Sequence, residues 1–206
     1  MKVVGVILAG GQSSRMGGGD KSLLELGGKT ILAHVIARLA PQVDAMVLNA
    51  NGDPERFAEY GLPVVADSIE GFAGPLAGAL AGMDWAHAQG ADYIVTVAAD
   101  TPFFPDNLLI ALQMAQESEN SPLAMAMTPD PVRKFARHPT FGLWSVALRD
   151  DLRAALKDGV RKVVQWTEPH GCAKIVFNYD GADPFFNVNT PEDMAKAETM
   201  LKGFDA

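Results

Sequence analysis

The sequence has a single cysteine, no long apolar run and no signal-peptide pattern, and each absence argues against a class of protein. Cys172 has no second cysteine to pair with and no partners at zinc-ligand spacing, so we interpret it as a structural thiol outside the chemistry. No stretch reaches the ~18 apolar residues of a membrane-spanning helix. Gly5 and the glycines after Leu8 interrupt the first apolar run, so we expect a cytoplasmic protein without a membrane partner.

Positive charge is also scarce. The 206 residues include 17 Lys and Arg against 25 Asp and Glu, which gives a net charge of −8. An acidic protein without a basic arm repels polyanions, so we expect a small-molecule ligand and no nucleic-acid partner. At this length, with 48% hydrophobic residues, the chain can bury a sizeable core, and we expect one domain.

Apolar runs and helical periodicities alternate along the chain. Strands are expected at 3–8, 45–48, 63–66, 93–98, 123–127 and 141–146, and helices at 31–39, 74–89, 108–114, 152–156, 163–166 and from Pro191. Thr190 is the expected N-cap of that last helix, because Pro191 and two acidic residues follow it. This alternation predicts an α/β fold whose mostly parallel central sheet is covered by helices on both faces.

The most informative segment is the glycine-rich loop after the first strand, Leu8-Ala9-Gly10-Gly11-Gln12-Ser13-Ser14-Arg15-Met16-Gly17-Gly18-Gly19, followed by Asp20-Lys21. Glycines let backbone N–H groups approach an anion closely, and Arg15 and Lys21 add positive charge. The loop leaves the strand at the edge where α/β sheets bind ligands, so we expect a polyphosphate site. A turn without a ligand is the plain alternative.

Two common phosphate-binding motifs do not match this loop. A P-loop needs adjacent Gly-Lys followed by Ser or Thr, but Asp20 separates Gly19 from Lys21. The dinucleotide fingerprint needs Gly-x-Gly-x-x-Gly and a later acidic residue, and that spacing does not follow the first strand. The sequence therefore argues against a Walker NTPase and against a redox dinucleotide.

Polar side chains follow three of the expected strands. Asp100 comes after the run at 93–98, Asp67 after that at 63–66, and Asn49 and Asn51 after that at 45–48. A lone carboxylate facing phosphates suits Mg²⁺, which prefers one or two carboxylates plus phosphate oxygens and water. The other three side chains can hydrogen-bond a base or ribose. Each has a structural alternative, Asp100 as the cap of the following turn and the others as turn residues.

The run Gly71-Phe72-Ala73-Gly74-Pro75-Leu76-Ala77-Gly78 opens the second long helix. Flexible residues with a proline in the first turn leave backbone donors free, so Gly74 is a candidate contact to a base or ribose. A simple helix start explains the same pattern.

Basic residues gather between Pro129 and Pro139, where we expect a mobile, proline-bounded loop that clamps a second phosphorylated ligand. Lys134 belongs to this loop, and the candidate acceptor-binding residues are Arg133, Arg137, His138, Arg161, Lys162, Asn187 and Asn189. His138 has no partner at metal spacing, so we expect neither a metal ligand nor a catalytic base there. Solvated surface charge is the alternative for the loop.

Together these motifs resemble the signature of the molybdenum cofactor guanylyltransferases. The matching segments, in order, are Leu8-Ala9-Gly10-Gly11-x-x-x-Arg15-Met16-Gly17-Gly18-x-Asp20-Lys21, Gly74-Pro75-Leu76-Ala77-Gly78, Asp100-Thr101-Pro102, His138-Pro139-Thr140 and Asn187-Val188-Asn189-Thr190-Pro191-Glu192. The resemblance implies a Rossmann-like nucleotidyltransferase domain over residues 1–206, in which 1–100 mainly bind GTP and 101–206 mainly bind the acceptor. It implies Mg²⁺-dependent transfer of GMP from GTP to the phosphate of molybdenum-molybdopterin, with release of pyrophosphate.

By position, the resemblance implies GTP contacts at Leu8, Ala9, Gly10, Lys21, Asn49, Asp67 and Asp100, with Mg²⁺ also held by Asp100. Gly11 and Gly74 join the nucleotide-binding set from their places in the glycine-rich segments. Because negative charge grows on the phosphates in the transition state, Arg15 and Lys21 are expected to be catalytic together with Asp100. Leu8-Ala9-Gly10-Gly11 is similar to the guanylyl form of the loop, whereas cytidylyl relatives resemble Leu-Ala-Ala-Gly.

Three alternatives stay open at this point. A molybdenum cofactor cytidylyltransferase would share the loop and differ in the base, and a sugar-1-phosphate nucleotidylyltransferase would differ in the acceptor. A non-catalytic nucleotide-binding module would dispense with Asp100 and Lys21, both of which are present. The expected partners beyond the substrates are other proteins of molybdenum cofactor biosynthesis and the recipient apoenzymes.

Overall fold

A computed structural model describes residues 1–10, 20–69, 71 and 74–204. These residues form a seven-stranded sheet in the order β5-β4-β1-β6-β8-β7-β9. The strands are β1 (Val3–Leu8), β4 (Ala45–Asn49), β5 (Val64–Val65), β6 (Tyr93–Ala98), β7 (Leu123–Asp130), β8 (Lys134–Ser145) and β9 (Ala173–Val176). All neighbouring pairs are parallel except those that β8 makes with β6 and β7. The mostly parallel sheet predicted from the sequence is therefore confirmed.

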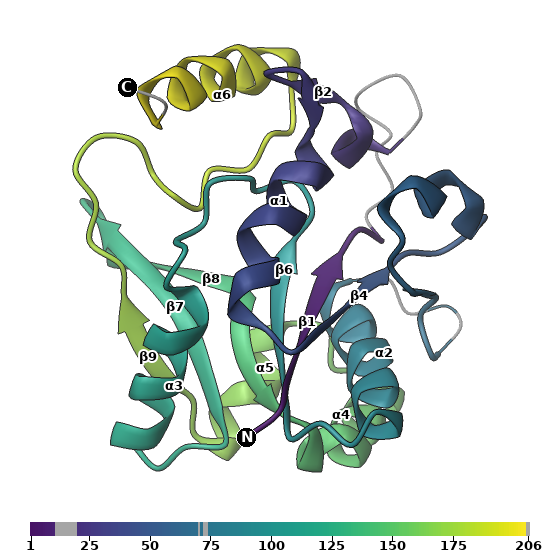
Figure 1. Cartoon of the computed structure of the whole chain (residues 1–206). Coiled ribbons are helices and arrows are strands. Elements are labelled where there is room, and N and C mark those ends of the chain that lie inside the picture. The colour runs from purple at the N-terminus through teal and green to yellow at the C-terminus, as the bar shows by residue number, and fades with distance from the viewer. Residues whose placement is uncertain (11–19, 70, 72–73, 205–206) are drawn as a thin grey trace.

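Helices cover both faces of this sheet (Figure 1). One face packs against α1 (Ile31–Leu39) and α3 (Leu108–Ser118), and the other against α2 (Pro75–Ala88), α4 (Arg149–Lys157) and α5 (Val163–Thr167). Leu32, Val35 and Leu39 place the apolar side of α1 in the first core. The Thr30 hydroxyl caps this helix by accepting a hydrogen bond from the Ala33 amide at 3.1 Å. The layered α/β architecture is thus as predicted.

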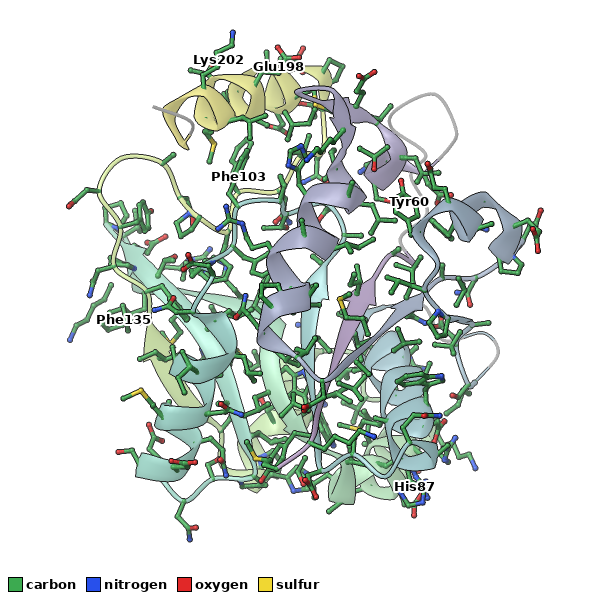
Figure 2. All side chains as sticks on the ribbon, in the orientation of Figure 1. Tyr60, His87, Phe103, Phe135, Glu198 and Lys202 are labelled. Carbon is green, nitrogen blue, oxygen red and sulfur yellow. The ribbon has the colours of Figure 1, made fainter. Side chains whose placement is uncertain are left out.

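A third cluster lies above the carboxyl ends of the strands, where α6 (Pro191–Phe204) sits beside the hairpin of β2 (Glu25–Leu26) and β3 (Lys29–Thr30) (Figure 1). Leu26, Phe103 and Val188 are buried together there, and Phe103 lies between α6 and the sheet (Figure 2). The predicted N-cap is confirmed, because the Thr190 hydroxyl accepts from the Asp193 amide at 3.1 Å. This cluster anchors the C-terminal segment over the sheet edge.

Short 3-10 helices connect these elements at η1 (Lys21–Leu23), η2 (Ala40–Gln42), η3 (Pro54–Tyr60), η4 (Val146–Leu148) and η5 (Glu168–His170). The longest helices among the described residues, α2 and α6, have 14 residues each. No helix in the described ranges is both long and apolar enough to cross a bilayer.

The prediction of a mobile loop between Pro129 and Pro139 is wrong, because most of this segment forms a β-hairpin. Strand β7 continues to Asp130 and β8 begins at Lys134, so only three residues turn the chain. A register shift separates Met125 from Ala126 on β7, and the facing residues on β8 jump from Gly142 to His138. Pro139 falls in this bulge, where a proline does not break the ladder. Pro139 therefore marks an irregularity within a strand pair, whereas Pro129 pairs regularly with Phe135 near the turn.

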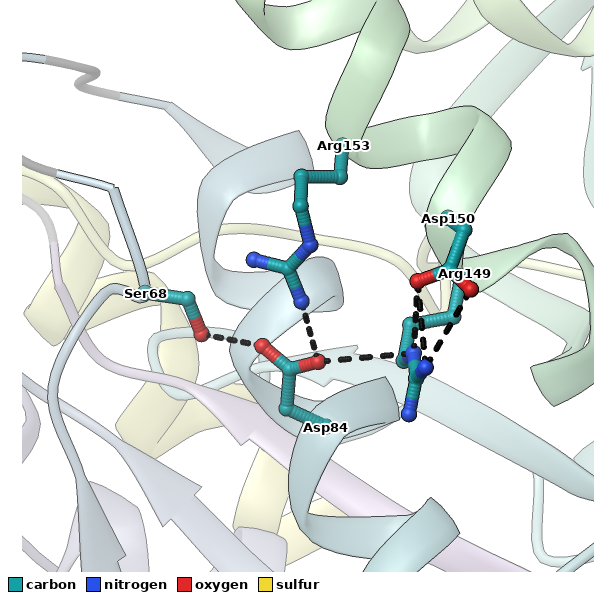
Figure 3. Close-up of polar contacts among 5 residues, drawn as sticks. All are labelled: Ser68, Asp84, Arg149, Asp150 and Arg153. Carbon is teal, nitrogen blue, oxygen red and sulfur yellow. Dashed lines mark hydrogen bonds and ion pairs between the residues drawn. The ribbon is translucent and has the colours of Figure 1, made fainter.

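Polar contacts tie α2 to α4 on the outside of the second layer (Figure 3). The Asp84 carboxylate accepts from Arg153 Nη2 at 2.5 Å and from the Ser68 hydroxyl at 2.6 Å, and Arg149 Nε lies 3.7 Å from it. Ser68 follows Asp67 in sequence, so this network also holds the segment after β5 against α2.

Replacing Gly142 with alanine should lower the free energy of unfolding by about 2 kcal/mol, a typical effect of overpacking. A Cβ atom there would overlap the indole ring of Trp144. Moving that ring would break the 2.7 Å bond from Trp144 Nε1 to the buried Thr96 hydroxyl. Urea denaturation measures the change. Gly203→Ala in α6 is the matched control, because nothing lies within 4 Å of its Cβ position, and it should cause no loss.

Candidate functional site

The carboxyl ends of β4, β1 and β6 lie side by side at one edge of the sheet, as the strand-end argument predicts. Leu8 pairs in register with Asn49 on one side and with Ala98 on the other. The Ala9 amide donates to the Asn49 carbonyl at 2.9 Å, and the Ala99 amide donates to the Leu8 carbonyl at 3.1 Å. The glycine-rich loop therefore starts between the ends of β4 and β6. Within it, Gly11 and Arg15 lie outside the described residues.

Asn49, Asn51 and Asp67 form one hydrogen-bonded cluster at this edge. Asn49 Nδ2 donates to Asp67 Oδ1 at 3.0 Å, and Asn51 Nδ2 donates to Asp67 Oδ2 at 2.9 Å. Asn51 Oδ1 accepts from the Asp67 amide at 2.9 Å. Each carboxylate oxygen keeps a lone pair for a further donor. The structure thus joins the three residues that the sequence placed separately, and holds a carboxylate in one orientation.

Glycines give the cluster room. The Asn49 side chain is buried, and a Cβ atom on Gly78 in α2 would overlap its amide. Gly10 lies beside the same side chain, with its Cβ position 3.5 Å from Asn49 Oδ1, an ordinary van der Waals distance. Gly74 is the N-cap of α2, with Pro75 in the first turn and a φ of +132° that favours glycine. The predicted helix start is therefore present at the same edge.

Asp100 lies two residues beyond β6 and interacts with Thr101, Val188 and Lys21. Its carboxylate oxygen Oδ1 accepts from the Thr101 hydroxyl at 3.2 Å, and its main-chain carbonyl accepts from the Val188 amide at 2.8 Å. Burial raises the pKa of the Asp100 carboxyl, while the Thr101 hydrogen bond and the charge of Lys21 oppose that rise. Lys21 Nζ donates to Asn189 Oδ1 at 3.2 Å. A carboxylate and an ammonium group from distant segments therefore share this edge.

Arg56 is a site residue that the sequence reasoning missed. Its Nη2 donates to the Asn51 carbonyl at 2.6 Å, its Nη1 donates to the Asp53 carbonyl at 2.6 Å, and its Nε lies 2.5 Å from the Asp20 carboxylate. The Asp20 charge that breaks the P-loop pattern is thus paired with a cation. Arg56 lies in η3, outside the motifs described in the sequence analysis, so no local sequence pattern identifies it.

The predicted acceptor residues divide into two groups. Asn187 and Asn189 lie beside Asp100 and Lys21, since Asn187 Oδ1 accepts from the Thr101 hydroxyl at 2.7 Å. The His138 ring stacks on Phe185 at 4.3 Å, and its Nε2 lies 2.8 Å from the Thr128 hydroxyl. Burial lowers the pKa of the His138 imidazole. This residue is therefore packed against the segment that carries both asparagines.

The basic members of the predicted set have contacts of their own. Arg133 lies in the hairpin turn, where its amide donates to Asp130 Oδ1 at 2.6 Å, and Arg137 Nη1 lies 3.5 Å from Glu168 Oε1. Arg161 Nη1 donates to the carbonyls of Leu156 and Val160, each at 3.0 Å, at the end of α4. Lys162 is the N-cap of α5. Acceptor binding by these four side chains stays a prediction.

Several known proteins are similar to this chain over nearly its whole length. The family model of the MobA-like NTP transferase domain matches residues 5–172. The molybdenum cofactor guanylyltransferase of Bradyrhizobium sp. (strain ORS 278) is 50% identical over 201 residues, 96% of this chain and 92% of the relative. The protein of the same name from Nitrobacter hamburgensis (strain DSM 10229 / NCIMB 13809 / X14) is 48% identical over 199 residues, 95% of this chain and 93% of the relative.

Solved structures share the fold at lower identity. The molybdopterin-guanine dinucleotide biosynthesis protein A of Archaeoglobus fulgidus has a TM-score of 0.73 at 22% identity, covering 97% of this chain and 99% of that one. A CMP:2-keto-3-deoxy-manno-octonic acid synthetase complexed with CTP has a TM-score of 0.72 at 16% identity, covering 99% of this chain and 100% of that one. The resemblance found in the motifs is confirmed, and the chain belongs to the MobA-like NTP transferase family.

Proposed function

We propose that this enzyme transfers GMP from GTP to the phosphate of molybdenum-molybdopterin, forming the guanine dinucleotide form of the cofactor and releasing pyrophosphate. The observation that carries the proposal is that the first residues of the glycine-rich loop, the Asp67 cluster and the pair of Asp100 and Lys21 lie at one edge of the sheet. The names of relatives about 50% identical support the same reaction. Residues 1–100 would mainly bind GTP and 101–206 the acceptor.

The Asp67 cluster accounts for a preference for guanine. Guanine presents N–H donors on its Watson–Crick edge, and a carboxylate is an acceptor-only group that can receive two of them. The amides of Asn49 and Asn51 hold the Asp67 carboxylate in place, so the acceptor is pre-organised. Cytosine presents an acceptor at the corresponding ring nitrogen, which would face a carboxylate unfavourably.

The residues at Asp100 fit a magnesium ion that is shared with the substrate. Among the described residues there is no cluster of three or more His, Cys, Asp or Glu side chains, so a cage made only of protein ligands is not formed there. One carboxylate next to a phosphate site is enough for Mg²⁺, because phosphate oxygens and water complete its six ligands. A bound ion would supply positive charge to the phosphates as negative charge develops on them.

The chain's own residues would position the reactants and stabilise charge. An oxygen of the acceptor phosphate attacks the α-phosphorus of GTP, and the bond from that phosphorus to the oxygen bridging to the β-phosphate breaks, which releases pyrophosphate. Lys21, Arg15 and the N–H groups of the glycine-rich loop would stabilise the charge that accumulates. A phosphate acceptor is already ionised at neutral pH, so the step requires no strong general base.

The first test is incubation of the protein with Mg²⁺, molybdopterin loaded with molybdenum, and each nucleoside triphosphate in turn. We expect pyrophosphate release with GTP and at least tenfold tighter binding of GTP than of CTP in titration calorimetry, because the wrong base loses the Asp67 hydrogen bonds. Equal affinity for both nucleotides would overturn the assignment of the base. Turnover with a sugar-1-phosphate in place of molybdopterin would overturn the assignment of the acceptor.

A second prediction concerns two basic side chains of the β7–β8 hairpin, Arg133 in its turn and Arg137 on β8. Reversing the charges of Arg133 and Arg137 to Glu should weaken molybdopterin binding about tenfold and leave GTP binding unchanged, because an anionic acceptor needs local cations in an acidic protein. Calorimetry at fixed ionic strength keeps screening constant between the variants. Lys174→Glu on β9 is the control for general charge. Unchanged molybdopterin affinity in the double variant would make these two side chains solvated surface charges.

The proposal extends to the delivery of the product. Delivery of the finished dinucleotide to molybdenum-dependent apoenzymes, directly or through other proteins of cofactor biosynthesis, would take place in the cytoplasm.

A further inference from the structure

The Ser68 hydroxyl joins the segment that carries Asp67 to helix α2. Ser68 Oγ donates to Asp84 Oδ2 at 2.6 Å, the length of a charge-assisted hydrogen bond. Figure 3 shows the two side chains directed at each other. Ser68 directly follows Asp67 in sequence, so this contact with α2 lies one residue away from a proposed base contact.

Asp67 lies beyond the end of its strand and depends on side chains for its orientation. Strand β5 is only two residues long, so Asp67 lies two positions past the last residue that pairs with β4. Its carboxylate and its amide bond to the side chains of Asn49 and Asn51, and Asn51 is exposed to water. On the other side of Asp67, the chain is held by the Ser68 bond and by packing of Ile69 against the second core.

Two arginines of α4 hold Asp84 in a fixed orientation. Asp84 Oδ1 accepts from Arg153 Nη2 at 2.5 Å and lies 3.7 Å from Arg149 Nε. All three side chains are partly buried, and a network of charges restrains a carboxylate better than one exposed pair does. The tie between α2 and α4 therefore uses Oδ1, which leaves Oδ2 as a fixed acceptor for Ser68.

We propose that Asp84 is a positioning residue for guanine recognition, which accepts from Ser68, fixes the main chain beside Asp67 and so aligns the Asp67 carboxylate with the base. The inference rests on the proposed function, because it takes Asp67 to receive N–H groups of the Watson–Crick edge. Guanine offers a ring N–H and an exocyclic amino group there, whereas hypoxanthine offers only the ring N–H. Two parallel bonds to one carboxylate require a fixed orientation, so Asp84 contributes to selection of the exocyclic amino group.

The test compares the binding of GTP with that of inosine triphosphate (ITP), whose base is hypoxanthine, in titration calorimetry with Mg²⁺. In the full chain, Ser68→Ala should raise the Kd of GTP about tenfold and that of ITP about threefold, because a displaced Asp67 loses two donors with GTP and one with ITP. The preference for GTP over ITP should therefore shrink about threefold. Ser68→Thr keeps the hydroxyl and should restore the preference.

Ser118→Ala, at the end of α3, is the matched control. Ser118 is also an exposed serine, so this variant reports what the loss of a surface hydroxyl does by itself. The affinities for GTP and for ITP should both equal those of the wild type.

A double-mutant cycle shows whether Ser68 acts through Asp84. Asp84→Ala should also narrow the preference for GTP over ITP, and Ser68→Ala should narrow it no further in that background. Circular dichroism verifies the fold, and Ser68→Ala decides the question alone if Asp84→Ala is unfolded.

The outcomes separate the inference from the proposed function. Equal losses of GTP and ITP affinity in Ser68→Ala, no loss at all, or additive narrowing in the cycle would overturn the inference and leave the wild-type preference for GTP intact. A wild-type protein that binds GTP and ITP equally would overturn the proposed contact between Asp67 and guanine, and the inference with it.

Discussion

Replacing Asp100 with alanine should reduce kcat for pyrophosphate release by about three orders of magnitude, comparable to removal of a main electrostatic contact to the transition state in other enzymes. The proposal assigns the metal to the Asp100 carboxylate, so the variant would lose the protein ligand that holds the ion next to the phosphates. Its main-chain carbonyl, which accepts from the Val188 amide, is retained in the variant. The fold should therefore persist, and the loss should appear in turnover.

Steady-state assays of the Asp100→Ala variant over a range of Mg²⁺ concentrations measure this effect. Asp106→Ala is the control, because Asp106 is an exposed carboxylate only six residues further along the chain. Its activity should equal that of the wild type. Near-normal pyrophosphate release by a folded Asp100→Ala variant would leave Asp100 with the role of capping the turn at Thr101.

Replacing Lys21 with alanine should lower kcat about a hundredfold, and should weaken GTP binding much less. Charge on the phosphates grows between the ground state and the transition state, so a cation placed there stabilises the transition state more. In the structure Lys21 Nζ contacts Asn189 Oδ1 at 3.2 Å and lies close enough to Asp100 to oppose the rise of its pKa. Arg15→Ala is expected to act in the same direction.

Separate measurement of kcat and of the GTP dissociation constant checks the Lys21 prediction. Lys29→Ala, an exposed lysine in β3, controls for the loss of one positive charge. Lys21→Arg should keep part of the activity, because it restores the charge with a different geometry. A higher KM at unchanged kcat for both Lys21→Ala and Arg15→Ala would make these residues contribute to binding alone.

The sequence by itself determined the layered fold and the place of the site. Apolar runs at 3–8 and 93–98 and the helical pattern at 31–39 were enough to predict two strands and a helix. A strand buried on both faces is a continuous apolar run, and a helix buried on one face has apolar residues at helical spacing. The same reasoning placed Asn49, Asp67 and Asp100 at one edge, since parallel strands end together. These inferences depend only on local pattern and on the rules of strand connection.

Only the tertiary structure decided which of these residues touch. Arg56 pairs with Asp20, and Thr101 contacts Asn187 86 positions further on, in segments whose local patterns say nothing about each other. The hairpin of β7 and β8 was likewise hidden, because Pro129 and Pro139 look like loop signals until the bulge that accommodates Pro139 is seen. Contacts across such distances arise from packing of the whole chain. A side chain's partner is therefore set by three-dimensional geometry, which a one-dimensional pattern does not contain.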